Sequence, residues 1–163
     1  MTNDPRKARF LDLCDNLGDN LCGDDRGDAA SAAASASLHP ALTHHEAAPL
    51  AGHVMLDLLE DHGFAPDDID AVVATTPLSI ALTTATMCAA SSRGLDLDSV
   101  MMCDGEPLAA IDLDGASLVL CLDRDDPTVR REVSENLHAR GAHVVGWATL
   151  TPLAVTVLES AEE

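Results

Sequence analysis

Two short segments combine apolar residues with the polar residues that bind phosphates or cations. In LVLCLDRDDPT (118–128) an apolar run leads into three aspartates, a proline and a threonine. In ATTPLS (74–79) an alanine leads into two threonines and a proline. Carboxylates are ligands for Mg²⁺, and hydroxyls beside a helix N-terminus can hold a phosphate. The ligand-binding candidates are therefore Thr75, Thr76, Asp123, Asp125, Asp126 and Thr128.

The segment 118–128 allows three interpretations. In the first, it is a buried strand followed by a helix that Asp126 caps and Pro127 begins, with Asp125 exposed to solvent. In the second, Asp123, Asp125 and Asp126 surround a Mg²⁺ ion with oxygen ligands. In the third, the turn after the strand holds a small phosphorylated ligand. The first interpretation makes the segment structural, and the other two make it a binding site.

The histidine-rich segment HPALTHHEAAPLAGH (39–53) is a second candidate site. Its four imidazoles and one carboxylate could bind zinc or nickel, with His44 and His45 as ligands. The spacing matches no standard zinc motif, and the alternative is a turn with surface histidines. The chain has no G-x-S-x-G elbow, Walker loop or G-x-G-x-x-G fingerprint. Cys121 lies within an apolar run, where a thiol is expected to be inert.

Composition limits the partners of the chain. Its 163 residues make one ordinary domain, and 28 acidic residues against 9 basic ones give a net charge of −19. Nucleic acids and anionic membranes are excluded as partners, because both require basic patches. Abundant acid and alanine with a single lysine are typical of a cytosolic protein from a halophilic archaeon, in which molar salt screens the self-repulsion of the chain. The acidic surface then reflects the solvent and not the function.

The cysteines and the termini indicate a cytoplasmic protein. There are five cysteines, and no C-x-x-C motif. Cys88, Cys103 and Cys121 fall in predicted core segments, so we expect small buried hydrophobes in a reducing compartment. The N-terminus lacks the apolar stretch of a signal peptide, and no apolar run approaches the length of a membrane span.

The N-terminal part of the chain is predicted to contain two helices with a loop between them. Apolar spacing predicts a helix over residues 5–21 and an amphipathic helix over 49–63. The segment 23–37 is rich in Gly, Asp, Ala and Ser, which favours a flexible acidic and alanine-rich loop. We therefore divide the chain into an N-terminal segment, 1–37, and an α/β domain, 38–163.

Strands and helices alternate in the rest of the chain. Helices are predicted from Pro77, capped by Thr76, to Gly94, and over residues 126–141. Continuous apolar runs are typical of strands buried on both faces of a parallel sheet. The alternation predicts an α/β fold, a three-layer parallel sheet with helices on both faces and ligands beyond the carboxyl ends of the strands. The predicted strands are 71–74, 99–103, 117–122, 143–150 and 153–159, and residues 107–115 are predicted to form a short strand and a turn.

This order of elements resembles the type I phosphoribosyltransferases, and the orotate phosphoribosyltransferase group most closely. LHPALT stands where that family has an early hairpin, and TTPLSIALTTATMCAA resembles its pyrophosphate loop and the following helix. The resemblance implies the phosphoribosyltransferase fold, a homodimer and a Mg²⁺-dependent site for phosphoribosyl diphosphate. It is carried by 38–43, 52–74, 75–90, 113–123 and 130–150.

The phosphate motif departs from the family pattern. Members of the family end an apolar strand in two adjacent acids, which hold ribose hydroxyls, and continue into a loop containing threonine and glycine around the 5-phosphate. Here the two acidic positions fall on Leu122 and Asp123, and the loop falls on 124–128, which contains no glycine. Pro127 lacks an N–H group, and Asp125 would repel a phosphate. The segment between 103 and 117 has no Lys or Arg that could cover a pyrophosphate.

The resemblance to phosphoribosyltransferases and the altered phosphate motif together allow three functions. The first is a phosphoribosyltransferase-like protein without catalysis, retained as a ligand sensor or an interaction subunit. The second is a divergent active transferase of nucleotide metabolism, in which Asp123 holds ribose hydroxyls and Thr128 contacts phosphate. The third is an oligomerisation protein that binds no ligand.

Overall fold

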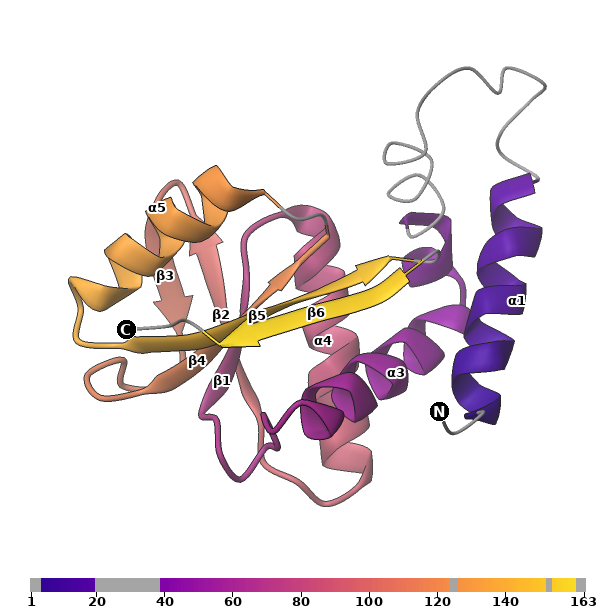
Figure 1. Ribbon diagram of the computed structural model, residues 1–163, viewed down its shortest axis with the longest axis horizontal. Coiled ribbons are helices and arrows are strands. Elements are labelled where there is room, and N and C mark those ends of the chain that lie inside the picture. The colour runs from indigo at the N-terminus through magenta and orange to yellow at the C-terminus, as the bar shows by residue number, and fades with distance from the viewer. Residues whose placement is uncertain (1–3, 20–38, 124–125, 152–153, 161–163) are drawn as a thin grey trace.

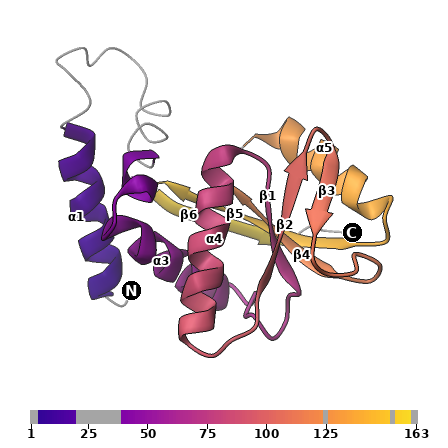
Figure 2. The ribbon, with the colours of Figure 1, turned by 180° about the vertical axis from the view of Figure 1, so that it is seen from behind.

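The computed structural model describes residues 4–19, 39–123, 126–151 and 154–160. Of its four longer helices, the last three cover the two faces of one sheet, and the first packs against the second (Figures 1 and 2). The four helices are α1 (Pro5–Asp19), α3 (Ala47–Asp61), α4 (Pro77–Ser92) and α5 (Pro127–His138). The strands are β1 (Ala71–Ala74), β2 (Asp98–Cys103), β3 (Glu106–Ala109), β4 (Ser117–Leu122), β5 (His143–Thr151) and β6 (Ala154–Ser160).

The six strands form one sheet in the order β3-β2-β1-β4-β5-β6. The four central strands are parallel, as the sequence predicts. The predicted parallel sheet is thus confirmed for the body of the sheet, and the two edge strands, which the alternation of elements does not orient, are antiparallel. Only two residues join β2 to β3 and two join β5 to β6, and a parallel connection needs a dozen or more.

The sheet separates two apolar cores, which makes the three layers of the fold. Val119 and Cys121 of β4 face the core shared with α1, α3 and α4. Leu118, Leu120 and Leu122 of the same strand face the core beneath α5. Successive side chains of a strand point to opposite faces, so β4 must be apolar throughout to fill both cores.

The N-terminal elements agree with the sequence except in one place. The predicted helix over 5–21 is described as far as Asp19, and the predicted loop 23–37 lies outside the described residues. Residues 39–43 are helical, so the hairpin that the resemblance places there is wrong. The apolar side chains Ala41 and Leu42 are buried on one side of this short helix, which suits helical and not alternating burial.

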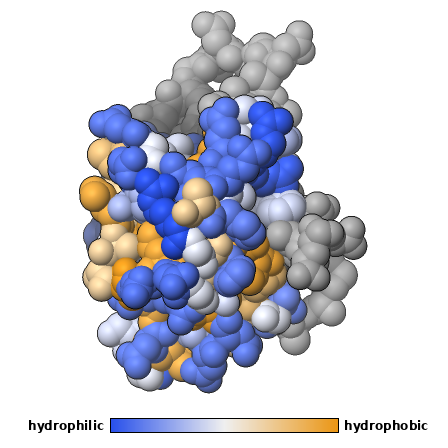
Figure 3. All heavy atoms as spheres, turned by 90° about the vertical axis from the view of Figure 1, so that its left-hand side faces the viewer, coloured by the Kyte–Doolittle hydropathy of each residue, from blue (hydrophilic) through white to orange (hydrophobic). Residues whose placement is uncertain are grey.

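One face of the molecule is largely hydrophilic. On the face that carries α5 and the β2–β3 hairpin, hydrophilic residues surround small apolar areas (Figure 3). Leu108 of β3 is the one large apolar side chain among the described residues that is strongly exposed. No described helix has the length and hydrophobicity needed to cross a membrane.

The cysteines do not all lie in the core. Cys14 and Cys121 are buried, whereas Cys88 and Cys103 are exposed, so the prediction of buried thiols is wrong for these last two. Cys88 lies on the side of α4 that faces away from the sheet, and Cys103 ends a strand one position from the sheet edge. Burial raises the pKa of the Cys121 thiol to about 12, because the thiolate would have no water around it.

Helices α3 and α4 approach each other at a glycine. A Cβ atom added at Gly52 would lie 2.2 Å from the carbonyl oxygen of Ala85, which is closer than any side-chain carbon can come to backbone. No flexible side chain is available to move aside there. Glycine is therefore required for the contact that joins these helices into one layer.

We expect Gly52→Ala to push α3 away from α4 and to lower the free energy of unfolding by at least about 2 kcal/mol. The measurement is urea unfolding in molar KCl, with Ser91→Ala on the exposed side of α4 as the control. An unfolding midpoint equal to that of the parent protein would show that the helices are not in contact at Gly52.

A thiol reagent should distinguish the two classes of cysteine. In a Cys22→Ser background at pH 8, we expect Cys88 and Cys103 to react in the native protein, because both thiols are exposed. Cys14 and Cys121 should react only after unfolding. Mass spectrometry of the labelled peptides gives the site assignment, and rapid labelling of native Cys121 would contradict the burial of β4.

Candidate functional site

The carboxyl ends of β1 and β4 are the place where this topology can bind a ligand. From β1 the chain crosses through α4 to β2 on one side, and from β4 it crosses through α5 to β5 on the other. The loops after β1 and β4 therefore diverge, and ligands of open α/β sheets bind where such loops part. Thr75 and Thr76 follow β1, and Asp123 follows β4.

Two of the predicted site residues meet at this point. The Oγ1 atom of Thr76 donates a hydrogen bond to Oδ1 of Asp123 at 3.2 Å, although 47 positions separate them in the chain. Both side chains are only partly buried. The contact joins the turn after β1 to the turn after β4.

The backbone N–H groups before α4 are already used. The Oγ atom of Ser79 accepts hydrogen bonds from the N–H groups of Thr75 (2.9 Å) and Thr76 (2.8 Å). Thr76 Oγ1 in turn accepts from the Ser79 N–H at 3.1 Å, which completes a capping box. A phosphate bound at this turn would need the same N–H groups, and Ser79 is fully buried beneath them.

The start of α5 is closed in a similar way. Asp126 Oδ1 accepts hydrogen bonds from the N–H groups of Thr128 (3.0 Å) and Val129 (3.3 Å). Pro127 occupies the first position of the helix and has no N–H to offer. The carboxylate of Asp126 thus stands where an anion would bind, as the capped-helix interpretation of 118–128 predicts.

The remaining candidates are placed less favourably. Thr128 is exposed in the first turn of α5. Asp125 lies outside the described residues. Thr75 Oγ1 is shielded from solvent and is the one buried side-chain oxygen or nitrogen of the described residues that has no hydrogen-bond partner.

The segment between β2 and β4, which the sequence analysis considered as a cover for a pyrophosphate, begins with a tight hairpin. Asp104 (φ 52°) and Gly105 (φ 80°) form the two-residue turn between β2 and β3, with the left-handed backbone that such turns require. Asn136 of α5 donates to the Gly105 carbonyl at 2.6 Å, and Arg140 pairs with Glu106. Sequence analysis missed these contacts, because they join positions more than 30 residues apart.

The histidines are distributed over structural roles. The Nδ1 atom of His44 lies 3.3 Å and 3.4 Å from the N–H groups of Glu46 and Ala47, so it accepts at the start of α3. The His44 and His45 rings are 4.5 Å apart, whereas His53 lies farther along α3 beside Arg93. Within the described residues no three His, Cys, Asp or Glu side chains come close enough to hold a metal ion. Asp125, one of the three predicted Mg²⁺ ligands, lies outside the described residues, so the Mg²⁺ site remains a prediction.

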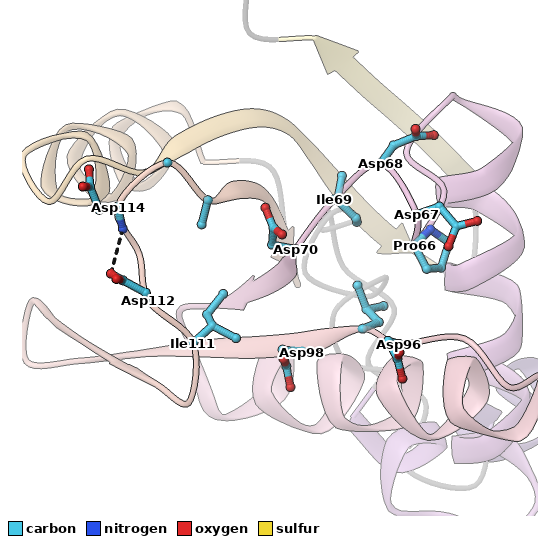
Figure 4. Close-up of a pocket in the computed structure, with 13 residues that line it drawn as sticks. Pro66, Asp67, Asp68, Ile69, Asp70, Asp96, Asp98, Ile111, Asp112 and Asp114 are labelled. Carbon is cyan, nitrogen blue, oxygen red and sulfur yellow. Dashed lines mark hydrogen bonds between the residues drawn. The ribbon is translucent and has the colours of Figure 1, made fainter.

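A hollow that sequence analysis missed lies at the opposite end of the strands from Thr76 and Asp123 (Figure 4). It has a volume of about 560 Å³ and adjoins the amino ends of β1, β2 and β4. Its carboxylates are spread around the rim and do not converge on one point. Such a surface disfavours anions. Seven aspartates contribute to it: Asp67, Asp68, Asp70, Asp96, Asp98, Asp112 and Asp114.

Comparison with known proteins identifies the fold. No protein-family profile and no curated protein sequence matches the chain. A similar solved structure is the crystal structure of Mycobacterium tuberculosis H37Rv orotate phosphoribosyltransferase in complex with Fe(III) dicitrate, with a TM-score of 0.67. The alignment has 20% identity and covers 90% of this chain and 83% of that one. The chain therefore has a phosphoribosyltransferase-like α/β fold, as the order of its elements predicts.

We expect Ser79→Ala to lower the free energy of unfolding by about 2 kcal/mol, because it leaves the N–H groups of Thr75 and Thr76 without their acceptor. The control is Thr84→Ala, which removes an exposed hydroxyl bonded only to its own helix. Chemical unfolding of both variants in molar KCl makes the comparison. Equal losses would show that the Ser79 hydroxyl does not close this turn.

Proposed function

We propose that this protein has a phosphoribosyltransferase-like fold but does not transfer phosphoribosyl groups, and that it acts as a ligand sensor or an interaction subunit. One observation carries the proposal. Both helix N-termini that could receive a phosphate are occupied by side chains of the chain itself, Ser79 at α4 and Asp126 at α5.

The charges at the end of β4 and the start of α5 also support the proposal. A phosphate approaching the start of α5 would meet the carboxylates of Asp123 and Asp126, and Asp126 lies within hydrogen-bond distance of the N–H groups that the phosphate would need. Like charges at such separations repel strongly in a partly desolvated site. Replacing the carboxylate by a phosphate would also uncap the helix, which costs about 1 kcal/mol.

The hairpin between β2 and β3 supports it further. Transfer of a phosphoribosyl group releases pyrophosphate, and stabilising the departing charge calls for a cation placed over it. The hairpin carries no Lys or Arg, and its contacts with Asn136 and Arg140 hold it against α5. It is therefore not arranged to supply that cation.

A divergent active transferase is the second candidate, and the contact between Thr76 and Asp123 favours it. This pair lies at the point where the loops part, and the buried Thr75 hydroxyl beside it has no partner. Asp123 would then hold the ribose hydroxyls of a phosphorylated ligand, and any Mg²⁺ would arrive with the diphosphate. The acidic composition points to molar salt as the medium for either function, and a cytoplasmic homodimer fits both.

Calorimetric titration of phosphoribosyl diphosphate with Mg²⁺ into the protein in molar KCl separates the two candidates. We expect no heat of binding at millimolar ligand, because the N–H groups of Thr75, Thr76, Ser79, Thr128 and Val129 already have acceptors within the chain. We also expect no turnover with orotate. The same titration into an active orotate phosphoribosyltransferase is the positive control.

Binding at micromolar concentration would contradict the proposal and favour the second candidate. Asp123→Asn, which keeps the shape of the side chain but removes its charge, must then abolish that binding. Binding that survives Asp123→Asn would place the ligand elsewhere on the molecule and leave the strand-end site without a ligand.

A further inference from the structure

A groove lies on the outer side of the helical layer, away from the strand ends. It is bounded by the start of α3, one side of α4 and the short helix 39–43, and it has a volume of about 530 Å³. That volume falls within the range of small-molecule pockets, which is about 300–1,000 Å³. Its principal lining residues are Leu42, Pro49, His53, Ala81, Ala85 and Cys88.

The groove is uncharged in a strongly acidic molecule. None of its lining residues is Asp, Glu, Lys or Arg, although 28 of the 163 residues are acidic. Most of the lining is alanine, leucine and proline, so a charged ligand would lose its hydration without gaining a partner. The lining therefore selects for an uncharged, largely apolar molecule.

His53 is a polar lining residue whose hydrogen-bonding roles follow from its contact with Arg93. Its Nδ1 atom lies 3.3 Å from Nη2 of Arg93, and a guanidinium can only donate, so Nδ1 must accept. The imidazole is then neutral and carries its proton on Nε2. Burial, followed by the charges of Arg93 and Arg6, lowers the pKa of His53, which favours the same neutral form.

Neighbouring contacts hold this histidine and the groove walls in place. Arg93 is paired with Asp57 and lies 3.3 Å from Glu60, both on α3. The backbone contact of Gly52 with Ala85 fixes α3 against α4. A pocket whose walls are already rigid loses little conformational entropy when a ligand enters.

From these observations we propose that the groove binds a small, uncharged, largely apolar molecule that presents one hydrogen-bond acceptor to the Nε2–H group of His53. The groove includes none of Thr76, Asp123 and Asp126. The inference is therefore independent of whether the strand ends bind phosphate, and it gives a sensor a ligand class of its own.

The test uses Nile red, a neutral apolar dye with one carbonyl acceptor, in fluorescence titrations of the full chain in molar KCl. We expect saturable binding to one site. Thr84→Trp places a large ring in the groove from an exposed position and should abolish the binding. Ser91→Trp, also exposed on α4 but outside the groove, should leave it unchanged.

The histidine is tested separately from the groove. His53→Leu keeps apolar area but removes the donor, and we expect it to weaken dye binding roughly fivefold. His53→Gln retains an N–H donor and should recover most of the affinity. Equal affinity in both variants would overturn the assigned role of His53.

Two further results would overturn the proposal. Dye binding that Thr84→Trp leaves intact would place the dye outside the groove. A concentration-dependent dimer that dissociates in Thr84→Trp but not in Ser91→Trp, seen by analytical ultracentrifugation, would show that a second copy of the chain occupies the groove.

Discussion

The burial of both faces of β4 is the constraint on which the rest of the structure depends. Leu118, Leu120 and Leu122 are shielded by the layer that contains α5, and Val119 and Cys121 by the layer that contains α3 and α4. Burying each large side chain contributes roughly 2 kcal/mol, and this gain is available only if helices cover both sides of the sheet. The βαβ connections supply those helices. They leave the paired strands β1 and β4 in opposite directions along the sheet, so their common hand places α4 and α5 on opposite faces. The place where a ligand could bind is thus a consequence of how the core is built.

That place also illustrates a conflict between stability and binding. The first turn of a helix has N–H groups that either a side chain or a ligand can satisfy. In this chain Ser79 and Asp126 satisfy them at α4 and α5, which stabilises both helices without a ligand. A protein that bound phosphate at these turns would leave them open and would be less stable when empty. The choice of capping residue therefore decides whether such a fold binds anions.

The sequence predicts those features that depend on neighbouring residues. Apolar runs and periodic spacing identify the central strands and the helices, and the pairs Thr76-Pro77 and Asp126-Pro127 mark two helix starts. Prediction from the sequence fails for contacts between residues that are far apart in the chain. It also fails for a buried polar side chain that forms its hydrogen bond within its own helix. Thr86 is buried in α4 because its hydroxyl bonds to the Leu82 carbonyl, so the helix buries polar residues where the pattern favours apolar ones.

The sequence predicts which turns could form the candidate site, but not whether the backbone N–H groups of those turns are free. The alternation of elements predicts that Thr76 and Asp123 both lie at carboxyl ends of strands. The pairing of β1 with β4, which makes these ends neighbours, comes from the structure. Whether the backbone N–H groups of Thr75 and Thr76 are free to bind a ligand depends on the rotamer of the Ser79 side chain, which cannot be inferred from the spacing of residues in the sequence. The exposure of Cys88 likewise depends on which side of α4 meets α3, and both sides of that helix are rich in small residues.

The scarcity of cations in this chain is a second feature that supports the proposal of a protein without phosphoribosyl transfer. Three of the arginines join elements of the tertiary structure: Arg9 pairs with Glu46, Arg93 with Asp57 and Arg140 with Glu106. Salt screens such pairs where they are exposed, but it screens the repulsion among the surrounding carboxylates as well. These three arginines are therefore engaged in tertiary contacts, in a chain that has only 9 basic residues against 28 acidic ones. A ligand that needs no cation, held in an uncharged groove, is the kind that this composition allows.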